Sequence, residues 1–596
     1  MRGRPAALLL GAVLVAGACS SSTSTPSTSA DVTPNFGTPV ASASLAPVNL
    51  ADTAYTALAA AKTGGSLVIG SFQRPSVANP YYALHNYDFE FTASLFEGLV
   101  KVTPDLRYVP DLASSVPTVE NGAVVLNGKG MDVTWQLRDN MQWSDGQYIT
   151  CDDVRATWSW VVDPTNSAIT TSMAGWASVS GVDGGGGLTC VVHFSTVYEG
   201  YLGLFSAILP AHYLQIVAAK GAGSKLYPMG DLASGVYSGP YIPTGEASST
   251  GIALAPNPDW ETISGHAPWL KSVKWKYYAD AASMTRGYVA GEIALGMDLT
   301  EADLPNLSAV TGSQVVIHDS LTYELQAFNN KSFKTRFGAD APLIIQAIKL
   351  ATDRGAIATG PLAGNVQVIT DFVSPLSWFY KAQGSPPAAD STSAATILAN
   401  AGWVRNSDGY LAKGRIVLEL NYCSTVRQAR IDTLKLVATQ LKAIGIKVDV
   451  NTRPNTDVFG LWSTSNATTG CNLAHGNFDV AEFSYVSPVD PLGGFNAYVS
   501  TQTPADTAAH DGQNITGVNL PALDEAYGTV RASADVNVVR DTMFGIQDIY
   551  GSDKNTYELP LYFRKDVWLV KPSLQNFAGG LTMSGAAWNM GDWWTS

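Results

Sequence analysis

The sequence predicts an α/β protein with at least two domains. Its 596 residues exceed the length that one hydrophobic core usually serves, and 46% of them are hydrophobic. The amphipathic stretch 427–445, RQARIDTLKLVATQLKAIG, ends at a glycine and leads into the strand-like KVDVNTR at 447–453. A helix followed at once by a strand is typical of an α/β lobe.

The first half of the folded chain begins with a strand and continues with mixed elements. A β-branched run at 65–70 follows a double glycine and predicts the first strand. Thr150 can cap a helix whose first turn holds two aspartates, which suit the positive end of a helix dipole. The other predicted elements are a helix over 91–100, a hairpin of VVLN (124–127) and VTWQL (133–137), and a turn that enters a strand within 181–194.

A second series of helices and strands starts near residues 325–329. Apolar residues at helical spacing mark LIIQAIKLAT at 343–352, and the chain alternates again between helices and strands after it. The remaining predicted elements are the helices 393–401, 427–445 and 538–550 and the strands 447–453 and 558–570. This series predicts a second α/β lobe.

The N-terminus predicts export. Two arginines precede the apolar run 6–15, which is too short to span a bilayer and is typical of a signal peptide. Residues 16–19, AGAC, resemble a bacterial lipobox, so we expect lipidation of Cys19, although Ala16 stands where leucine is usual. An ordinary secretory signal is the alternative. The stretch 20–64 is rich in Ser, Thr, Pro and Ala, has hardly a charge and predicts a flexible tether. The folded body is expected outside the cytoplasm, anchored to the outer face of the cytoplasmic membrane.

Composition excludes some partners. The formal net charge is −14, only 14% of residues are charged, and basic clusters are absent from the sequence, which argues against a nucleic-acid partner. The chain also lacks CxxC and HxxxH spacings, so we expect neither a metal site nor a cofactor. After Cys19, four cysteines remain, and an even number outside the cytoplasm suggests disulfides. Three pairings are possible. We favour Cys151–Cys190 and Cys423–Cys471, because each pair would then lie within one predicted domain.

A series of short motifs resembles one family in both content and order. They are YVPDLASS (108–115), TWQLRDNMQWSDGQYITCDDV (134–154), ILPAHYL (208–214), SGPYIPTG (238–245), NPDWE (257–261), AGEI (290–293), ATDR (351–354), LANAGW (398–403), IGIKV (444–448) and ELPLY (558–562). Together they resemble the dipeptide- and oligopeptide-binding family, family 5, of extracytoplasmic solute-binding proteins that serve ABC importers. Departures, such as Cys151-Asp152 in place of the usual Ala-Glu and Ile345 in place of a common arginine, do not affect the fold.

The resemblance implies a two-lobe fold like that of periplasmic binding proteins, class II and cluster C. Lobe I would comprise 65–325, with an extra subdomain, and the returning segment 559–596, while lobe II would span 326–558. Two crossover segments, near 321–328 and 555–562, would form a hinge. The family also implies a monomer that closes around a small solute and delivers it to the transmembrane subunits of an ABC permease.

The loop after FDVAEFSYV (478–486) is the predicted ligand site. In peptide-binding relatives this loop places an aromatic residue beside the ligand and then offers an aspartate to the α-ammonium of the peptide. The aromatic position falls on Tyr485, but the aspartate position falls on Ser487 or Pro488. We interpret Asp490 as part of an Asp-Pro pair that sets the loop geometry; the alternative is that a re-aimed Asp490 takes over the missing role.

The missing aspartate predicts an unusual specificity. An ammonium enclosed in a cleft needs a carboxylate partner, and leaving it unpaired costs several kcal/mol. We therefore expect that free peptide N-termini are not captured in the usual way. A cleft with Phe483, Tyr485, Trp462 and Phe72 suits a neutral or apolar-faced solute, a sugar or a capped peptide, with groups such as Ser487 as hydrogen-bond partners.

Two other functions compete with solute import. An exported hydrolase lacks support, because the sequence contains neither a GxSxG nor an HExxH motif and has only seven scattered histidines. A receptor that senses a solute for a signalling partner would have the same lobes and cleft, and only its partner would differ. We expect a binding protein rather than an enzyme.

Overall fold

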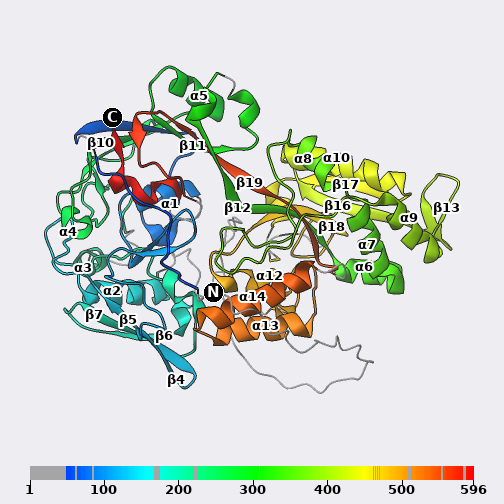
Figure 1. Cartoon of the computed structure of the whole chain (residues 1–596), viewed down its shortest axis with the longest axis horizontal. Helices are drawn as coiled ribbons and strands as arrows, with labels where there is room; N and C mark the ends of the chain where they lie inside the picture. The colour runs from blue at the N-terminus through cyan, green and yellow to red at the C-terminus, as the bar shows by residue number, and fades with distance from the viewer. Residues whose placement is uncertain are drawn as a thin grey trace.

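Two lobes joined by two long strands form the protein. The computed structural model describes residues 48–60, 63–83, 86–166, 175–219, 226–307, 309–460, 462–463, 465, 468, 470–507, 510, 512–551, 555–580 and 585–596. The joining strands are β12 (Val315–Phe328) and β19 (Glu558–Val570), which pass between the lobes in Figure 1. This is the two-lobe α/β fold that the sequence predicts.

One mixed sheet runs through both lobes. Its order within the described residues is β17-β16-β18-β12-β19-β11-β1-β10-β9-β8. The bounds of the strands other than β12 and β19 are β17 (Lys447–Arg453), β16 (Glu419–Thr425), β18 (Val480–Val486), β11 (Leu295–Thr300), β1 (Gly65–Ser71), β10 (Leu270–Tyr277), β9 (Gly251–Pro256) and β8 (Tyr241–Pro243). In lobe I β1 is parallel to β10 and β11, and in lobe II β16 is parallel to β17 and β18.

The ladder between β12 and β19 is interrupted where the chain passes from one lobe to the other. Asp319 pairs with Lys565, but the next paired residues are Tyr323 and Phe563, so three residues of β12 stand opposite one of β19. A bulge of this kind weakens the ladder locally and bends the strand. Beyond the bulge, β12 also pairs with β18 of lobe II, from Thr322 to Phe328.

Lobe I carries a four-stranded antiparallel sheet of its own. Its strands are β4 (Val124–Asn127), β5 (Gly130–Gln136), β7 (Thr189–Phe194) and β6 (Val179–Asp183). The helices of lobe I are α1 (Asn86–Ala93), α2 (Cys151–Val162), α3 (Ala211–Ala219), α4 (Glu261–Ser264) and α5 (Ala281–Val289). Thr150 caps α2 in a capping box with Asp153, as the sequence predicts.

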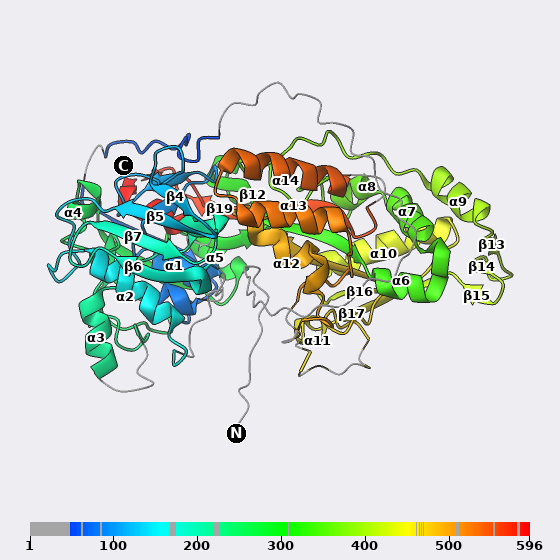
Figure 2. The same cartoon turned by 90° about the horizontal axis from the view of Figure 1, so that it is seen from below.

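Lobe II packs helices against its part of the sheet. These are α6 (Asn330–Phe337), α7 (Ala341–Ala351), α8 (Arg354–Thr359), α9 (Ser391–Asn400), α10 (Gln428–Ala443) and α11 (Asn455–Val458). A separate layer consists of α12 (Phe495–Tyr498), α13 (Pro521–Ala532) and α14 (Val536–Gly551), drawn in orange in Figure 2. Short strands complete the fold: β2 (Val100–Val102), β3 (Tyr108–Pro110), β13 (Val404–Arg405), β14 (Leu411–Lys413), β15 (Ile416–Val417), β20 (Leu574–Gln575) and β21 (Trp594–Thr595).

Most predicted elements are confirmed, but the helix over 91–100 is wrong. Helix α1 ends at Ala93, and the following residues bond to other parts of the chain. The Leu99 N–H donates to the Phe205 carbonyl (2.9 Å) and the Glu97 N–H to the Ser238 hydroxyl (2.9 Å). These tertiary bonds satisfy the backbone that a longer helix would have used.

The predicted tether is too long at its C-terminal end. Residues 48–60 lie against the folded body, whereas residues 1–47, with Cys19, lie outside the described part of the chain. Leu50 is buried, the Ala54 N–H donates to Asp105 (2.9 Å), and the Tyr55 hydroxyl donates to Asp592 (3.1 Å). The apolar and aromatic side chains within this Ser/Thr/Ala-rich stretch anchor it.

Among the described helices, none combines the length and the apolar character needed to cross a membrane.

Candidate functional site

The carboxyl ends of the parallel strands of both lobes face the junction between the lobes. In open α/β sheets ligands bind beyond such strand ends. The end of β11 in lobe I is followed by Glu301, and the end of β16 in lobe II is followed by Arg427. Arg427 Nη2 lies 2.6 Å from Glu301 Oε1, so the two strand ends meet across the junction. We call the region between these strand ends the interlobe cleft.

A buried carboxylate at the back of the cleft collects three arginines. Glu324 of β12 is 0% exposed and accepts hydrogen bonds from Arg430 (3.0 Å, Nε to Oε2), Arg427 (3.3 Å, Nη1 to Oε1) and Arg564 of β19 (2.8 Å, Nε to Oε1). Burial alone would raise the pKa of Glu324, but the charges of the arginines lower it well below its usual range. Arg427, Arg430 and Arg564 are thus already engaged by Glu324 and Glu301.

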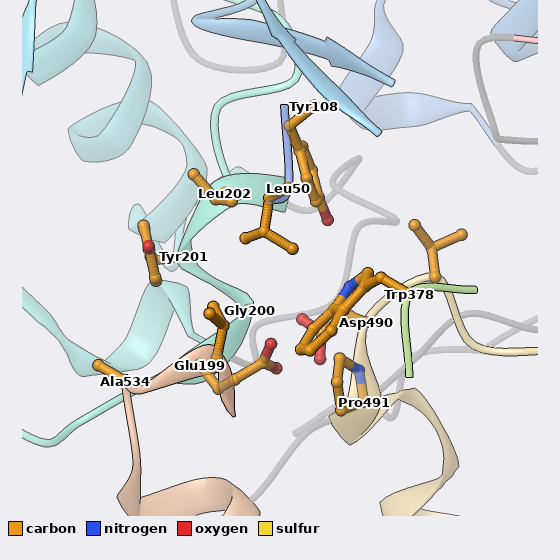
Figure 3. A pocket seen from close by; sticks show the side chains of 12 residues that line it. Leu50, Tyr108, Glu199, Gly200, Tyr201, Leu202, Trp378, Asp490, Pro491 and Ala534 are labelled. Atoms are coloured by element: carbon orange, nitrogen blue, oxygen red, sulfur yellow. The ribbon is translucent and has the colours of Figure 1, made fainter. Parts of the chain in front are cut away.

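A second contact between the lobes joins two carboxyl groups. Glu199 belongs to a short 3-10 helix of lobe I (Glu199–Gly203), and Asp490 lies in the loop after β18. Their side chains are hydrogen-bonded, and Figure 3 shows them pointing toward each other. Gly200 permits this approach, because a Cβ placed there would lie 1.8 Å from Asp490 Oδ2.

The carboxyl pair has to hold a proton. Burial and the charge of Asp490 raise the pKa of Glu199 well above its usual value, and burial raises that of Asp490. Beside the pair is a cavity of about 10 Å³ that is lined by Trp378, Tyr108 and Leu50, among others. It has room for about one water molecule.

The structure brings four of the predicted site residues together. Phe483 and Tyr485 of β18 meet edge to face with 4.9 Å between ring centroids, but Phe483 is only 1% exposed and belongs to the core. The Tyr485 hydroxyl donates to the Gln513 carbonyl (3.0 Å). Ser487 is fully buried, and its hydroxyl accepts a hydrogen bond from the Ser374 N–H (2.7 Å).

Asp490, the fourth of these residues, caps the short 3-10 helix Pro491–Gly494. Its Oδ1 accepts a hydrogen bond from the Leu492 N–H (2.8 Å) while its other oxygen faces lobe I. The aspartate therefore has both a structural role in the loop and a contact with Glu199.

The other two predicted residues lie apart from this loop. Phe72 is half-buried in a separate apolar cluster of lobe I that contains Met284. Trp462 is stacked on His510, with 4.5 Å between ring centroids, and also contacts His475 (4.3 Å). Other side chains of the protein already pack against both rings.

Sequence reasoning missed the charged residues of the cleft. Glu324 was detectable as a single carboxylate inside the apolar strand LTYELQAF, where an unpaired charge would be costly. Its partners Arg427 and Arg564 carry no comparable signal, because they are far from Glu324 in the sequence.

Two disulfides fasten the lobes internally. Cys151 of α2 is joined to Cys190 of β7, and Cys423 of β16 is joined to Cys471, the pairing that the sequence favours. The described residues contain no group of three or more His, Cys, Asp or Glu side chains arranged to hold a metal ion.

Two lobes, two crossover strands and a charged cleft between strand ends define the class of hinged solute-binding proteins. The comparisons are more specific. A family model for bacterial extracellular solute-binding proteins, family 5, matches residues 107–506. The chain belongs to this family, whose members bind solutes for ABC importers and are not enzymes.

Relatives agree with this assignment. The chain is 26% identical to the oligopeptide-binding protein AppA of Bacillus subtilis over 405 residues, which cover 65% of this chain and 68% of that protein. It is similar to the structure of AppA in complex with a nonapeptide (TM-score 0.63, 22% identity, 90% and 99% of the two chains covered). It is also similar to the periplasmic EDTA-binding protein EppA (TM-score 0.71, 19% identity, 90% and 97% covered).

Proposed function

We propose that the protein captures a peptide or a related small solute in the interlobe cleft by hinge closure and delivers it to the membrane subunits of an ABC importer. The observation that carries this proposal is the meeting of strand ends from both lobes, through Arg427 and Glu301, across two crossover strands with an interrupted ladder. Contacts on both lobes are what a solute needs to favour the closed form. Similar proteins are described as oligopeptide-binding and EDTA-binding, which supports a cleft for a small solute but leaves its chemical class open.

The loop after β18 supports an unconventional mode of recognition. Ser487, at the position of the usual aspartate, is buried and bonded to Ser374. Asp490 is engaged by Leu492 and Glu199. Neither side chain presents a free carboxylate to a peptide N-terminus, so the proposal keeps the prediction that this loop does not capture it.

The proposal includes an attachment to the membrane and a division into lobes. Cys19 would carry lipid and hold a monomeric protein at the outer face of the cytoplasmic membrane. Lobe I would comprise 65–325 and 559–596, and lobe II would comprise 326–558. The hinges would lie where β12 and β19 pass from one lobe to the other. Metabolic labelling with a radioactive fatty acid in wild type and Cys19→Ala tests the anchor.

A screen tests the binding function. Thermal unfolding is measured with peptide mixtures and oligosaccharides, and small-angle scattering then compares the free protein with any stabilised mixture. A rise in Tm with a smaller radius of gyration is expected. A protein that neither gains stability nor contracts with any mixture would contradict solute capture. Recovery of permease subunits with the tagged protein from its own cells would favour import over the alternative, a solute-sensing receptor.

A further inference from the structure

Besides the joining strands β12 and β19, residues 48–60 also connect the two lobes. We call this segment the strap. It begins beside α14 of lobe II and continues along lobe I toward the C-terminus, drawn in dark blue in Figure 2. It passes the seam at which Glu199 of lobe I meets Asp490 of lobe II, because Leu50 lines the same cavity as both of them. The strap therefore contacts both lobes where they meet.

The strap is bonded to lobe I at several points along its length. The Tyr108 N–H of β3 donates to the Leu50 carbonyl (2.8 Å). At the other end, the backbone of Leu58 exchanges two hydrogen bonds with the side chain of Asn576 (both 2.8 Å). Between these points, three more side chains of lobe I bond to the strap: Asp105, Asn589 and Asp592. Lobe I thus holds the strap from Leu50 to Leu58.

Lobe II holds only the beginning of the strap. The Val48 N–H donates to Asn537 Oδ1 of α14 (3.1 Å). The Leu50 side chain is 6% exposed, and Figure 3 shows it between Tyr108 of lobe I and Trp378 of lobe II. One hydrogen bond and the packing of one side chain are a weaker attachment than the series of bonds to lobe I.

This unequal attachment decides which end of the strap yields when the lobes separate. In the proposed hinge motion α14 and Trp378 move away from β3, and the strap cannot follow both lobes. It stays with lobe I, because breaking several hydrogen bonds costs more than breaking one. Opening then exposes Leu50 to water and leaves the Val48 N–H without Asn537, and closing restores both contacts.

We propose that the strap latches the closed form: it is fixed to lobe I, and Val48 and Leu50 engage lobe II when the lobes close. The inference rests on the proposed hinge closure and adds a device that regulates it. Burial of an apolar side chain and formation of a hydrogen bond both favour the closed form. A solute that binds the closed form gains affinity when that form is more populated, so the strap strengthens binding without touching the solute.

The variant Asn537→Ala tests the strap, because it removes the acceptor of the Val48 N–H. Loss of this bond should lower the closure constant about fivefold. The measurement is the closed fraction of the solute-free full chain by small-angle scattering at one pH. Asn537→Asp keeps an oxygen acceptor, and its charge suits the first turn of α14, so it should match the wild type. The matched control Leu58→Ala should also match, because this side chain is 61% exposed and the bonds to Asn576 come from its backbone.

Hydrogen exchange followed by mass spectrometry supplies a second measurement on the same proteins. In Asn537→Ala, residues 48–52 should exchange faster than in the wild type, whereas residues 53–58 should keep the wild-type rate because lobe I still holds them. An unchanged closed fraction in Asn537→Ala, an equal loss in Asn537→Asp, or faster exchange along the whole strap would overturn the latch while solute capture stands. A wild-type protein that never contracts, with or without solute mixtures, would overturn hinge closure and the latch together.

Discussion

The two carboxyl groups that meet between the lobes, those of Glu199 and Asp490, make closure depend on pH. In the open protein each group would face water and titrate near its usual pKa of about 4. In the closed protein, burial and the like charge of Asp490 raise the pKa of Glu199, and burial raises the pKa of Asp490. Closure between pH 5 and pH 7 therefore takes up a proton.

The sign and size follow from linkage. Well below pH 4 both carboxyls are protonated in either state, so the closed form has its full stability. As the pH rises, the open form loses a proton that the closed form retains, and closure weakens about tenfold per pH unit, or about 1.4 kcal/mol. The loss stops once the pH passes the pKa of the closed pair. From pH 5 to pH 7 the pair would lower the closure constant by up to about 100-fold.

The variant Asp490→Asn isolates this effect. Its amide can donate to the Glu199 carboxylate without an added proton, and its oxygen can still accept from Leu492. Small-angle scattering of the solute-free protein from pH 5 to pH 7 should show the closed fraction falling in the wild type and in the surface control Asp408→Asn. The closed fraction of Asp490→Asn should fall less steeply with pH, because its closure takes up one proton fewer than closure of the wild type. Parallel curves for the wild type and Asp490→Asn would refute the reasoning.

Three further changes probe the scaffold. Glu324→Gln leaves three arginines around a neutral group and should lower the free energy of unfolding in urea by about 3–5 kcal/mol; a loss below about 1 kcal/mol would contradict its role. Replacing Cys423 and Cys471 by serine opens a link across 48 residues and should cost about 4 kcal/mol, seen as a Tm below that of the oxidised wild type; an unchanged Tm would contradict its role. Leu50→Ala should cost about 2 kcal/mol and speed proteolysis of residues 48–60, and unchanged cleavage would argue against an anchored segment.

The sequence was sufficient for elements whose signals are local. The strands 447–453 and 558–570 have the predicted bounds because β-branched and aromatic runs end at polar or turn residues, and α10 stops before Gly445, which has a left-handed φ of 92°. The helix over 91–100 failed because bonds from Phe205 and Ser238, distant in sequence, decide that backbone.

The cleft was predictable only in part. The loop after β18 is marked by its aromatics and prolines, and it does lie between the lobes. The charged contacts between the lobes join residues from distant segments of the sequence, such as Glu199 with Asp490 and Arg427 with Glu301.

The charge of the cleft bears on why closure should follow binding. Arg427 and Glu301 attract the lobes to each other, whereas Glu199 and Asp490 oppose closure near neutral pH unless they hold a proton. Near neutral pH the empty protein would gain from the first contact and lose from the second, so neither contact alone commits it to the closed form. A bound solute shifts this balance only if it contacts both lobes, so it must extend from the strand ends of lobe I to the loop after β18.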